Sequence, residues 1–308
     1  MAYSDKYKTV FYSSNEKEAI IAELNRLAID GNYVFRGYNK QEELLPGIIR
    51  EKKIAFEENM LEDFEKYGCH YFHAITPIDF MSYAQHFGIP TRLLDFTYNP
   101  FIALFFALFR QKGSNNSIED DNEYYYIRFA SLTENICLSN IAYPNSYGML
   151  SYPTESLAEK ACKCIESVRK AYGDGEKRNI SEVYDHRIRE EEAKKQKDNA
   201  DDAFYHPKAD ANQDKFMNDA ILFIDPNQAN QRIIMQQGLF MFPYTLNKEK
   251  HLEIIQKNTK CIMIHKTHRI ALLQYLDTMG YNTFRLNPDI GSICEAIRQK
   301  YRENRNKK

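Results

Sequence analysis

Residues 84–109 read AQHFGIPTRLLDFTYNPFIALFFALF, and this stretch decides how the middle of the chain folds. Its second part, Pro100 to Phe109, is apolar on every side, which predicts a helix buried in the core rather than one on the surface. Proline suits the first position of that helix, and Asp95, Thr97 or Asn99 could cap it. The segment is about half as long as a membrane span requires, so it predicts a core helix.

The first part of the stretch is a connector between two predicted helices, and polar side chains crowd it. Leu93, Leu94 and Phe96 anchor it in the core. Helix capping accounts for one or two of the polar residues but not for an arginine and a histidine as well. Polar groups on an apolar scaffold, beside a helix N-terminus that favours anions, indicate a binding site. These polar residues are His86, Thr91, Arg92, Asp95, Thr97 and Asn99.

Working outward, strands and helices alternate without the regular spacing of βαβ units. This predicts an α+β fold with small mixed or antiparallel sheets packed against helices, in one elaborated domain over residues 1–308. The predicted helices cover residues 15–29, 53–67, 77–87, 100–109, 155–172, 269–279 and 289–301. The predicted strands cover residues 33–36, 124–129, 221–225, 239–242 and 261–265.

Composition excludes several classes of protein. The 308 residues carry 41 basic and 43 acidic side chains, so no overall positive charge draws the chain to nucleic acid or to an anionic membrane. The first residues lack the apolar segment of a secretory signal, and the 6 cysteines are scattered, which together predict a reduced, cytoplasmic protein. Residues 173–216 are highly polar, which predicts an exposed insertion with a solvated surface as its default role.

A second pattern is Phe35-Arg36-Gly37, at the end of a short apolar strand. An arginine there is costly to bury unless it is paired, and its planar fork suits a carboxylate or a phosphate. The adjacent glycine would let a ligand approach the backbone. From these three residues alone, an internal salt bridge to Asp95 is favoured over ligand binding.

A third pattern runs from Asn230 to Phe240, where a short helical turn leads through a glycine into a strand. Arg232 and Gln236 lie four residues apart and share a face of that turn. Elsewhere, His70 and His73 match no zinc signature, so no metal is expected.

In this order the three patterns resemble the FRG domain family, named for its Phe/Tyr-Arg-Gly motif. Residues 84–107 match the long signature of that family almost position by position, and Arg232 to Phe240 fits its later motif. The resemblance covers about residues 33–242, with 173–216 as an insertion and 245–308 as a C-terminal α/β extension.

A more distant similarity to ADP-ribosyltransferase-like folds implies roles for individual residues. It implies that Arg36 binds a phosphate or the ribose of NAD, that Gly37 receives the carboxamide, and that Asp95 and Thr97 hold Arg36 or the ribose. Gln236 then takes the place of a late glutamate; it cannot act as a carboxylate base, so Asp95 would supply the acid. The remaining substrate-binding residues would be His86, Thr91, Arg92, Asn99 and Arg232.

The leading hypothesis is therefore an enzyme that uses NAD, similar to ADP-ribosyltransferases or NAD glycohydrolases, which acts as a toxin or phage-defence effector. The resemblance implies a nucleotide as ligand, a protein or RNA as acceptor, and a protein partner such as an antitoxin, with no membrane. The alternative is a non-catalytic module for a nucleotide or a protein, whose motifs form a structural polar network. A nuclease or RNA-binding protein would need a basic groove, to which Arg92, Arg110, Arg128 and Arg232 could contribute, but neither the net charge nor a metal motif favours this interpretation.

Overall fold

One mixed β-sheet of eight strands organises the protein, in the order β1-β8-β4-β2-β3-β7-β6-β5. The computed structural model describes residues 9–11, 17–68, 70–71, 77–109, 122–139, 221–226, 231–243, 245–287 and 290–303. β1 runs parallel to β8 and β5 parallel to β6, while the other neighbours are antiparallel. The strands are β1 (Thr9–Phe11), β2 (Tyr33–Tyr38), β3 (Leu94–Thr97), β4 (Tyr124–Ser131), β5 (Ile136–Ser139), β6 (Leu222–Asp225), β7 (Gly238–Phe242) and β8 (Lys260–His265).

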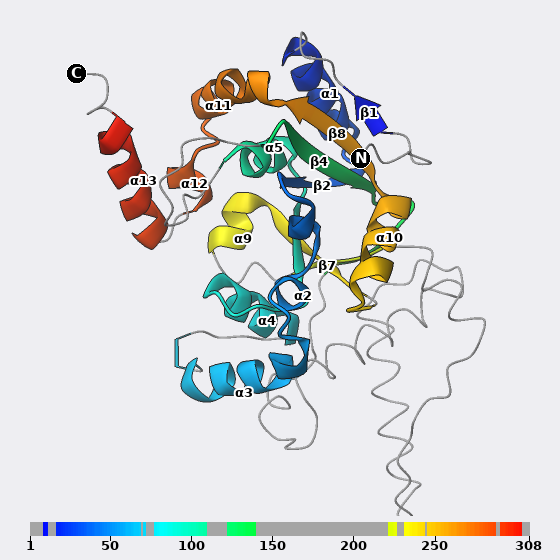
Figure 1. Ribbon diagram of the computed structural model, residues 1–308, viewed down its shortest axis with the longest axis vertical. Coiled ribbons are helices and arrows are strands. Elements are labelled where there is room, and N and C mark those ends of the chain that lie inside the picture. Colours follow the sequence, from blue (N-terminus) through cyan, green and yellow to red (C-terminus); the bar gives the residue numbers. More distant parts are fainter. Residues whose placement is uncertain are drawn as a thin grey trace, which may run out of the picture.

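Helix α5 (Pro100–Leu108) is the centre of the larger core, as its all-round apolar sequence predicts. It packs against β2, β4 and β8 together with α1 (Lys17–Asp30) and α11 (Arg269–Thr278), as Figure 1 shows. Alternate residues of the strands point into this core, among them Phe35, Ile127 and Ile262. Helix α5 is apolar on every face because the surrounding strands and helices bury it on every side.

A second core covers strand residues such as Val34 and Tyr38, which alternate with those facing α5. Helix α10 (Lys248–Asn258) packs there through Ile254 and Ile255, next to the short helix η1 (Gln41–Leu44). Helix α2 (Gly47–Arg50) follows η1 and adds a small cluster with Leu45.

Of the remaining helices, α9 contacts β7 and lies between α5 and α4 in Figure 1. They are η2 (Ile54–Phe56), α3 (Glu57–Gly68), α4 (Pro77–His86), α9 (Gln231–Gln236), η4 (Lys266–His268), α12 (Thr283–Leu286) and α13 (Ile290–Glu303). Across the described ranges, no helix combines the length and apolar character needed to cross a membrane.

The α+β prediction is confirmed, but the strands join in one sheet rather than in several small ones. Most predicted elements appear within a few residues of their expected bounds. The predicted helix 155–172 and the polar insertion 173–216 lie outside the described residues.

Several elements were not predicted from the sequence, and β3 and α10 are the two that matter most for the site. Residues 94–97 were assigned to a polar connector and instead form β3, a strand that pairs with β2 and β7. Residues 248–258 form α10, whose buried face is small and includes a histidine, His251.

Candidate functional site

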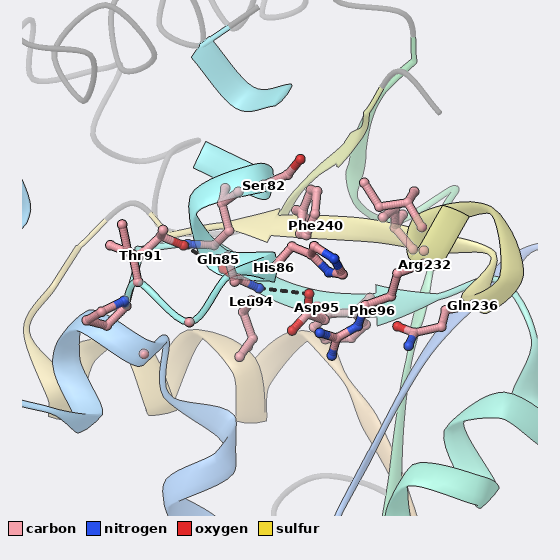
Figure 2. Close-up of a pocket in the computed structure, with 18 of the residues that line it drawn as sticks. Ser82, Gln85, His86, Thr91, Leu94, Asp95, Phe96, Arg232, Gln236 and Phe240 are labelled. Atoms are coloured by element: carbon pink, nitrogen blue, oxygen red, sulfur yellow. Dashed lines mark hydrogen bonds between the residues drawn. The ribbon is translucent and has the colours of Figure 1, made fainter. Parts of the chain in front are cut away.

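The three motifs meet at one pocket of about 460 Å³, close to β3. The motif around Arg36 comes from β2, the long polar motif from α4 and β3, and the late motif from α9 and β7. Figure 2 shows Gln85, His86 and Asp95 close together, with Arg232 and Gln236 of α9 farther along the pocket. Six of the ten predicted site residues line the pocket: Arg36, His86, Thr91, Asp95, Arg232 and Gln236.

Arg36 is fixed by two backbone carbonyl groups. Nε and Nη2 donate to the Glu43 carbonyl oxygen at 3.1 and 2.5 Å, and Nη1 donates to the Asp95 carbonyl oxygen at 2.6 Å. β2 and β3 are paired in register only at Phe35 and Thr97, so the guanidinium bridges the strands where they separate. Desolvation lowers the pKa of Arg36, and the charges of Asp95 and Glu43 oppose this effect. An arginine nevertheless stays protonated at neutral pH.

The predicted salt bridge between Arg36 and Asp95 is therefore wrong. The contact uses the main-chain carbonyl of Asp95, and no ion pair of Arg36 is formed within the described residues. Three of its five N–H groups donate to carbonyl oxygens, and the other two have no acceptor among the described part of the chain. The guanidinium therefore faces the pocket with no direct ion-pair partner in the described part of the chain, and the charges of Asp95 and Glu43 act on it only from a greater distance.

The Asp95 carboxylate is oriented by a chain of neutral side chains. Gln85 Nε2 donates to Asp95 Oδ1 at 2.8 Å, and Thr91 Oγ1 donates to Gln85 Oε1 at 2.5 Å. The backbone N–H of Leu93 donates to Thr91 Oγ1 at 3.2 Å, which fixes the direction of the chain. Asp95 is an exposed residue of β3, so its second carboxylate oxygen is accessible from the pocket. Thr91 thus acts through Gln85. Gln85 lies within residues 84–109 but was not among the predicted site residues.

Gln236 is also held by its side-chain amide. Nε2 donates to the Leu286 carbonyl oxygen at 2.8 Å and to Asn287 Oδ1 at 3.1 Å. Thr97, predicted to bind the ligand, does not line the pocket and instead donates from Oγ1 to the Gln236 carbonyl oxygen at 2.6 Å. Thr97 therefore ties the end of β3 to the end of α9.

Arg92 lies outside the pocket lining and forms a buried ion pair. Its Nη2 is 2.5 Å from Oε2 of Glu57, and Nε and the backbone N–H of Arg92 also donate to this carboxylate. The Glu57 side chain is only 3% exposed, so this pair joins α3 to the connector. The structure gives Arg92 a structural role in place of the predicted substrate contact.

Asn99 and Gly37 also have packing roles. Asn99 Oδ1 accepts the N–H of Phe101 at 2.9 Å and so caps α5, while its Nδ2 donates to the Tyr281 hydroxyl at 3.0 Å. A Cβ atom on Gly37 would lie 1.7 Å from the Ala103 carbonyl oxygen of α5. The close approach that this glycine permits is therefore that of a helix, which corrects the expectation of a ligand there.

The pocket carries more basic than acidic groups. Arg36, the exposed Arg50 and the half-buried Arg232 line it, against Asp95 and Glu51. Glu51 lies 3.1 Å from Lys53, which offsets its charge. Arg232 forms no hydrogen bond or ion pair with the part of the chain that the structure describes. Arg50 was missed because α2 has no sequence signature of a site.

His251 of α10 supports the same loop as Arg36. Its Nε2 lies 3.0 Å from the Leu44 carbonyl oxygen, next to the Glu43 carbonyl that accepts from Arg36. Burial lowers the pKa of His251 to about 4, so the imidazole is neutral at pH 7 and donates through Nε2. No sequence pattern indicates this contact, because it joins residues 207 positions apart.

No three His, Cys, Asp or Glu side chains are grouped as metal ligands among the residues described. In comparisons with known proteins, residues 31–116 match the FRG domain family. No curated protein and no solved structure matches the chain. The match includes the Arg36 motif and the long polar motif, whereas α9 and the C-terminal elements lie beyond it.

Proposed function

Because the chain carries an FRG domain whose two motifs line one cationic pocket, we propose that this pocket binds an anionic nucleotide, with NAD as the first candidate. The volume of about 460 Å³ lies within the usual range for small-molecule sites. The resemblance to ADP-ribosyltransferase-like folds is the reason for choosing NAD among the nucleotides.

One observation carries the proposal: the guanidinium of Arg36 is held in place by carbonyl oxygens and not by a carboxylate. Carbonyl dipoles orient the fork without neutralising its charge, so a bound phosphate would supply the missing anion. Arg128 lies directly opposite Arg36 on β4 and donates to the neutral groups Tyr38 Oη and Thr259 Oγ1. This second guanidinium adds to the positive potential that an anion would relieve.

We further propose that the protein cleaves the bond between the anomeric carbon and the nicotinamide nitrogen. The bonding electron pair would leave with the nicotinamide nitrogen, and positive charge would develop on the ribose. The accessible oxygen of Asp95 would stabilise that charge, and water or an acceptor hydroxyl would form the new C–O bond. The carboxylate would then receive the proton of the nucleophile and release it to solvent.

Calorimetric titration with NAD tests binding, and release of nicotinamide tests catalysis. Arg232→Ala is the informative variant, since Arg232 has no hydrogen bond or ion pair within the described residues that would be lost. It should weaken binding about tenfold or more. Arg36→Ala should abolish binding, but it also frees the Glu43 carbonyl. Absence of binding by the unaltered protein would refute the proposal.

Asp95→Asn separates the enzyme from a binding module. Asparagine can still accept from Gln85 through its oxygen, so the geometry is retained while the charge is lost. We expect unchanged or tighter NAD binding and no nicotinamide release. Sustained turnover by this variant would exclude Asp95 as the catalytic carboxylate.

The second candidate is a module that binds a nucleotide without cleaving it. It is favoured by Gln236, because a neutral amide occupies the place that the resemblance gives to a glutamate. NAD binding without nicotinamide release by the unaltered protein would support this candidate. An enzyme that consumes NAD would instead deplete it in cells, as expected of a toxin or phage-defence effector.

A further inference from the structure

The side-chain amide of Gln236 can adopt only one orientation. The Leu286 carbonyl oxygen, 2.8 Å away, belongs to the main chain and can only accept a hydrogen bond. The atom facing it must therefore be Nε2, and Asn287 Oδ1 at 3.1 Å takes the second hydrogen of the same nitrogen. Exchange of the amide oxygen and nitrogen would place two oxygens in contact, so the network fixes the assignment.

Only an acceptor remains on Gln236 for the pocket. Both hydrogens of Nε2 are used, and Oε1 receives no hydrogen bond from the residues that the structure describes. Gln236 lines the pocket, and in Figure 2 its amide oxygen lies on the side of Asp95. The accessible oxygen of Asp95 is likewise an acceptor. The arginines supply the opposite property, since guanidinium groups only donate.

The segment that fixes Gln236 is residues 281–287, here called the C-terminal clamp. It also holds the long polar motif, because the Tyr281 hydroxyl accepts from Asn99 Nδ2 at 3.0 Å. The Tyr281 ring stacks on Phe101, with centroids 6.0 Å apart. The C-terminal clamp lies outside the matched residues 31–116 but contacts Gln236 of the pocket and Asn99 at the start of α5.

We propose that Gln236 is a specificity-determining residue that accepts a hydrogen bond from an N–H or O–H group of the nucleotide, and that Asn287 is its positioning residue. This inference rests on the proposed binding of a nucleotide. A carboxamide N–H and a ribose hydroxyl share the required chemistry. A carboxylate at the same position would meet Oε1 with another acceptor, and the pocket would reject it.

Binding of three dinucleotides tests the proposal: NAD, nicotinic acid adenine dinucleotide, and 2′-deoxyribosyl NAD. The second replaces the carboxamide with a carboxylate, and the third removes a hydroxyl, so the pair distinguishes the two donors. We expect one of them to bind the unaltered protein about tenfold or more weakly than NAD. In Gln236→Met, the ratio of the dissociation constant of that analogue to that of NAD should approach one.

Two further variants keep the proposal testable if Gln236→Met does not fold. Asn287→Ala frees one N–H of Gln236, so the discrimination should fall while the bond to Leu286 remains. Tyr281→Phe is the matched control, since it removes only the hydroxyl that accepts from Asn99, keeps the contacts of Gln236 with Leu286 and Asn287, and should leave the ratio unchanged.

The outcomes separate the inference from the function on which it rests. If NAD does not bind, the proposed function fails, and the inference fails with it. If NAD binds and both analogues bind as tightly as NAD, only the inference is refuted. The same holds if the ratio of the analogue's dissociation constant to that of NAD is equal in Asn287→Ala and in the unaltered protein.

Discussion

The carbonyl oxygen of Glu43 accepts two N–H groups of Arg36, at 3.1 Å from Nε and 2.5 Å from Nη2. This contact joins β2 to η1 and orients the guanidinium toward the pocket. Because the acceptor is a backbone carbonyl, a substitution of the Glu43 side chain would not remove it. His251 holds the neighbouring Leu44 carbonyl, so the loop that orients the arginine is itself supported from α10.

Arg36→Lys should therefore be destabilising, although the charge is retained. A lysine cannot donate two parallel bonds to one carbonyl and a third to Asp95, and roughly 1.5–3 kcal/mol of stability should be lost. Urea unfolding measures the change. Hydrogen exchange at residues 41–45 should become faster, and unchanged protection there would show that the arginine does not hold η1.

Gly37→Ala should prevent correct folding or cost about 3 kcal/mol or more, because the new methyl group would overlap the backbone of α5 at Ala103. Gly238→Ala is the matched control, since its nearest neighbour would be an ordinary 3.6 Å away. Thermal unfolding of both variants decides the question. Equal stability of the two would mean that α5 can move away from β2.

Removing one member of the Arg92–Glu57 pair should cost about 3–5 kcal/mol, because a buried charge would remain without its partner. Arg92→Met tests this, and the double variant Arg92→Met/Glu57→Leu should recover much of the loss. Chemical denaturation of the single and double variants gives the coupling energy. Strictly additive effects would contradict a structural ion pair.

Because of His251, the free energy of unfolding should decrease as the pH is lowered from about 6.5 to about 4. Its folded-state pKa of about 4 lies below the usual 6.5, so in this range the unfolded chain binds a proton that the folded protein does not. The contribution is complete above pH 6.5 and amounts to roughly 3 kcal/mol.

His251→Gln keeps a donor for the Leu44 carbonyl but does not titrate. The free energy of unfolding of this variant, measured at pH 7 and pH 5, should therefore change less than that of the unaltered protein. The comparison with the unaltered protein cancels the other titrating groups. The same pH dependence in both proteins would assign it to other residues.

The sequence by itself determined the elements with strong local patterns. An all-round apolar segment after a proline could only be a buried helix, and α5 follows it closely. The cost of burying a charge pointed to Arg36, the crowded polar connector pointed to Asp95, and the resemblance pointed to Gln236; all three line the pocket. The long polar motif was sufficient for the family, which residues 31–116 match.

Only the tertiary structure decided which polar groups are paired with each other and which face the pocket. Arg92 and Arg36 look alike in sequence, yet one meets a buried carboxylate from α3 and the other meets two carbonyl groups. Such partners come from distant parts of the chain, and sequence spacing carries no information about them. The same holds for Gln236, whose orientation depends on a carbonyl group 50 residues away. Local propensity determines elements, whereas the charge left over at a site depends on contacts that form only when the whole chain has folded.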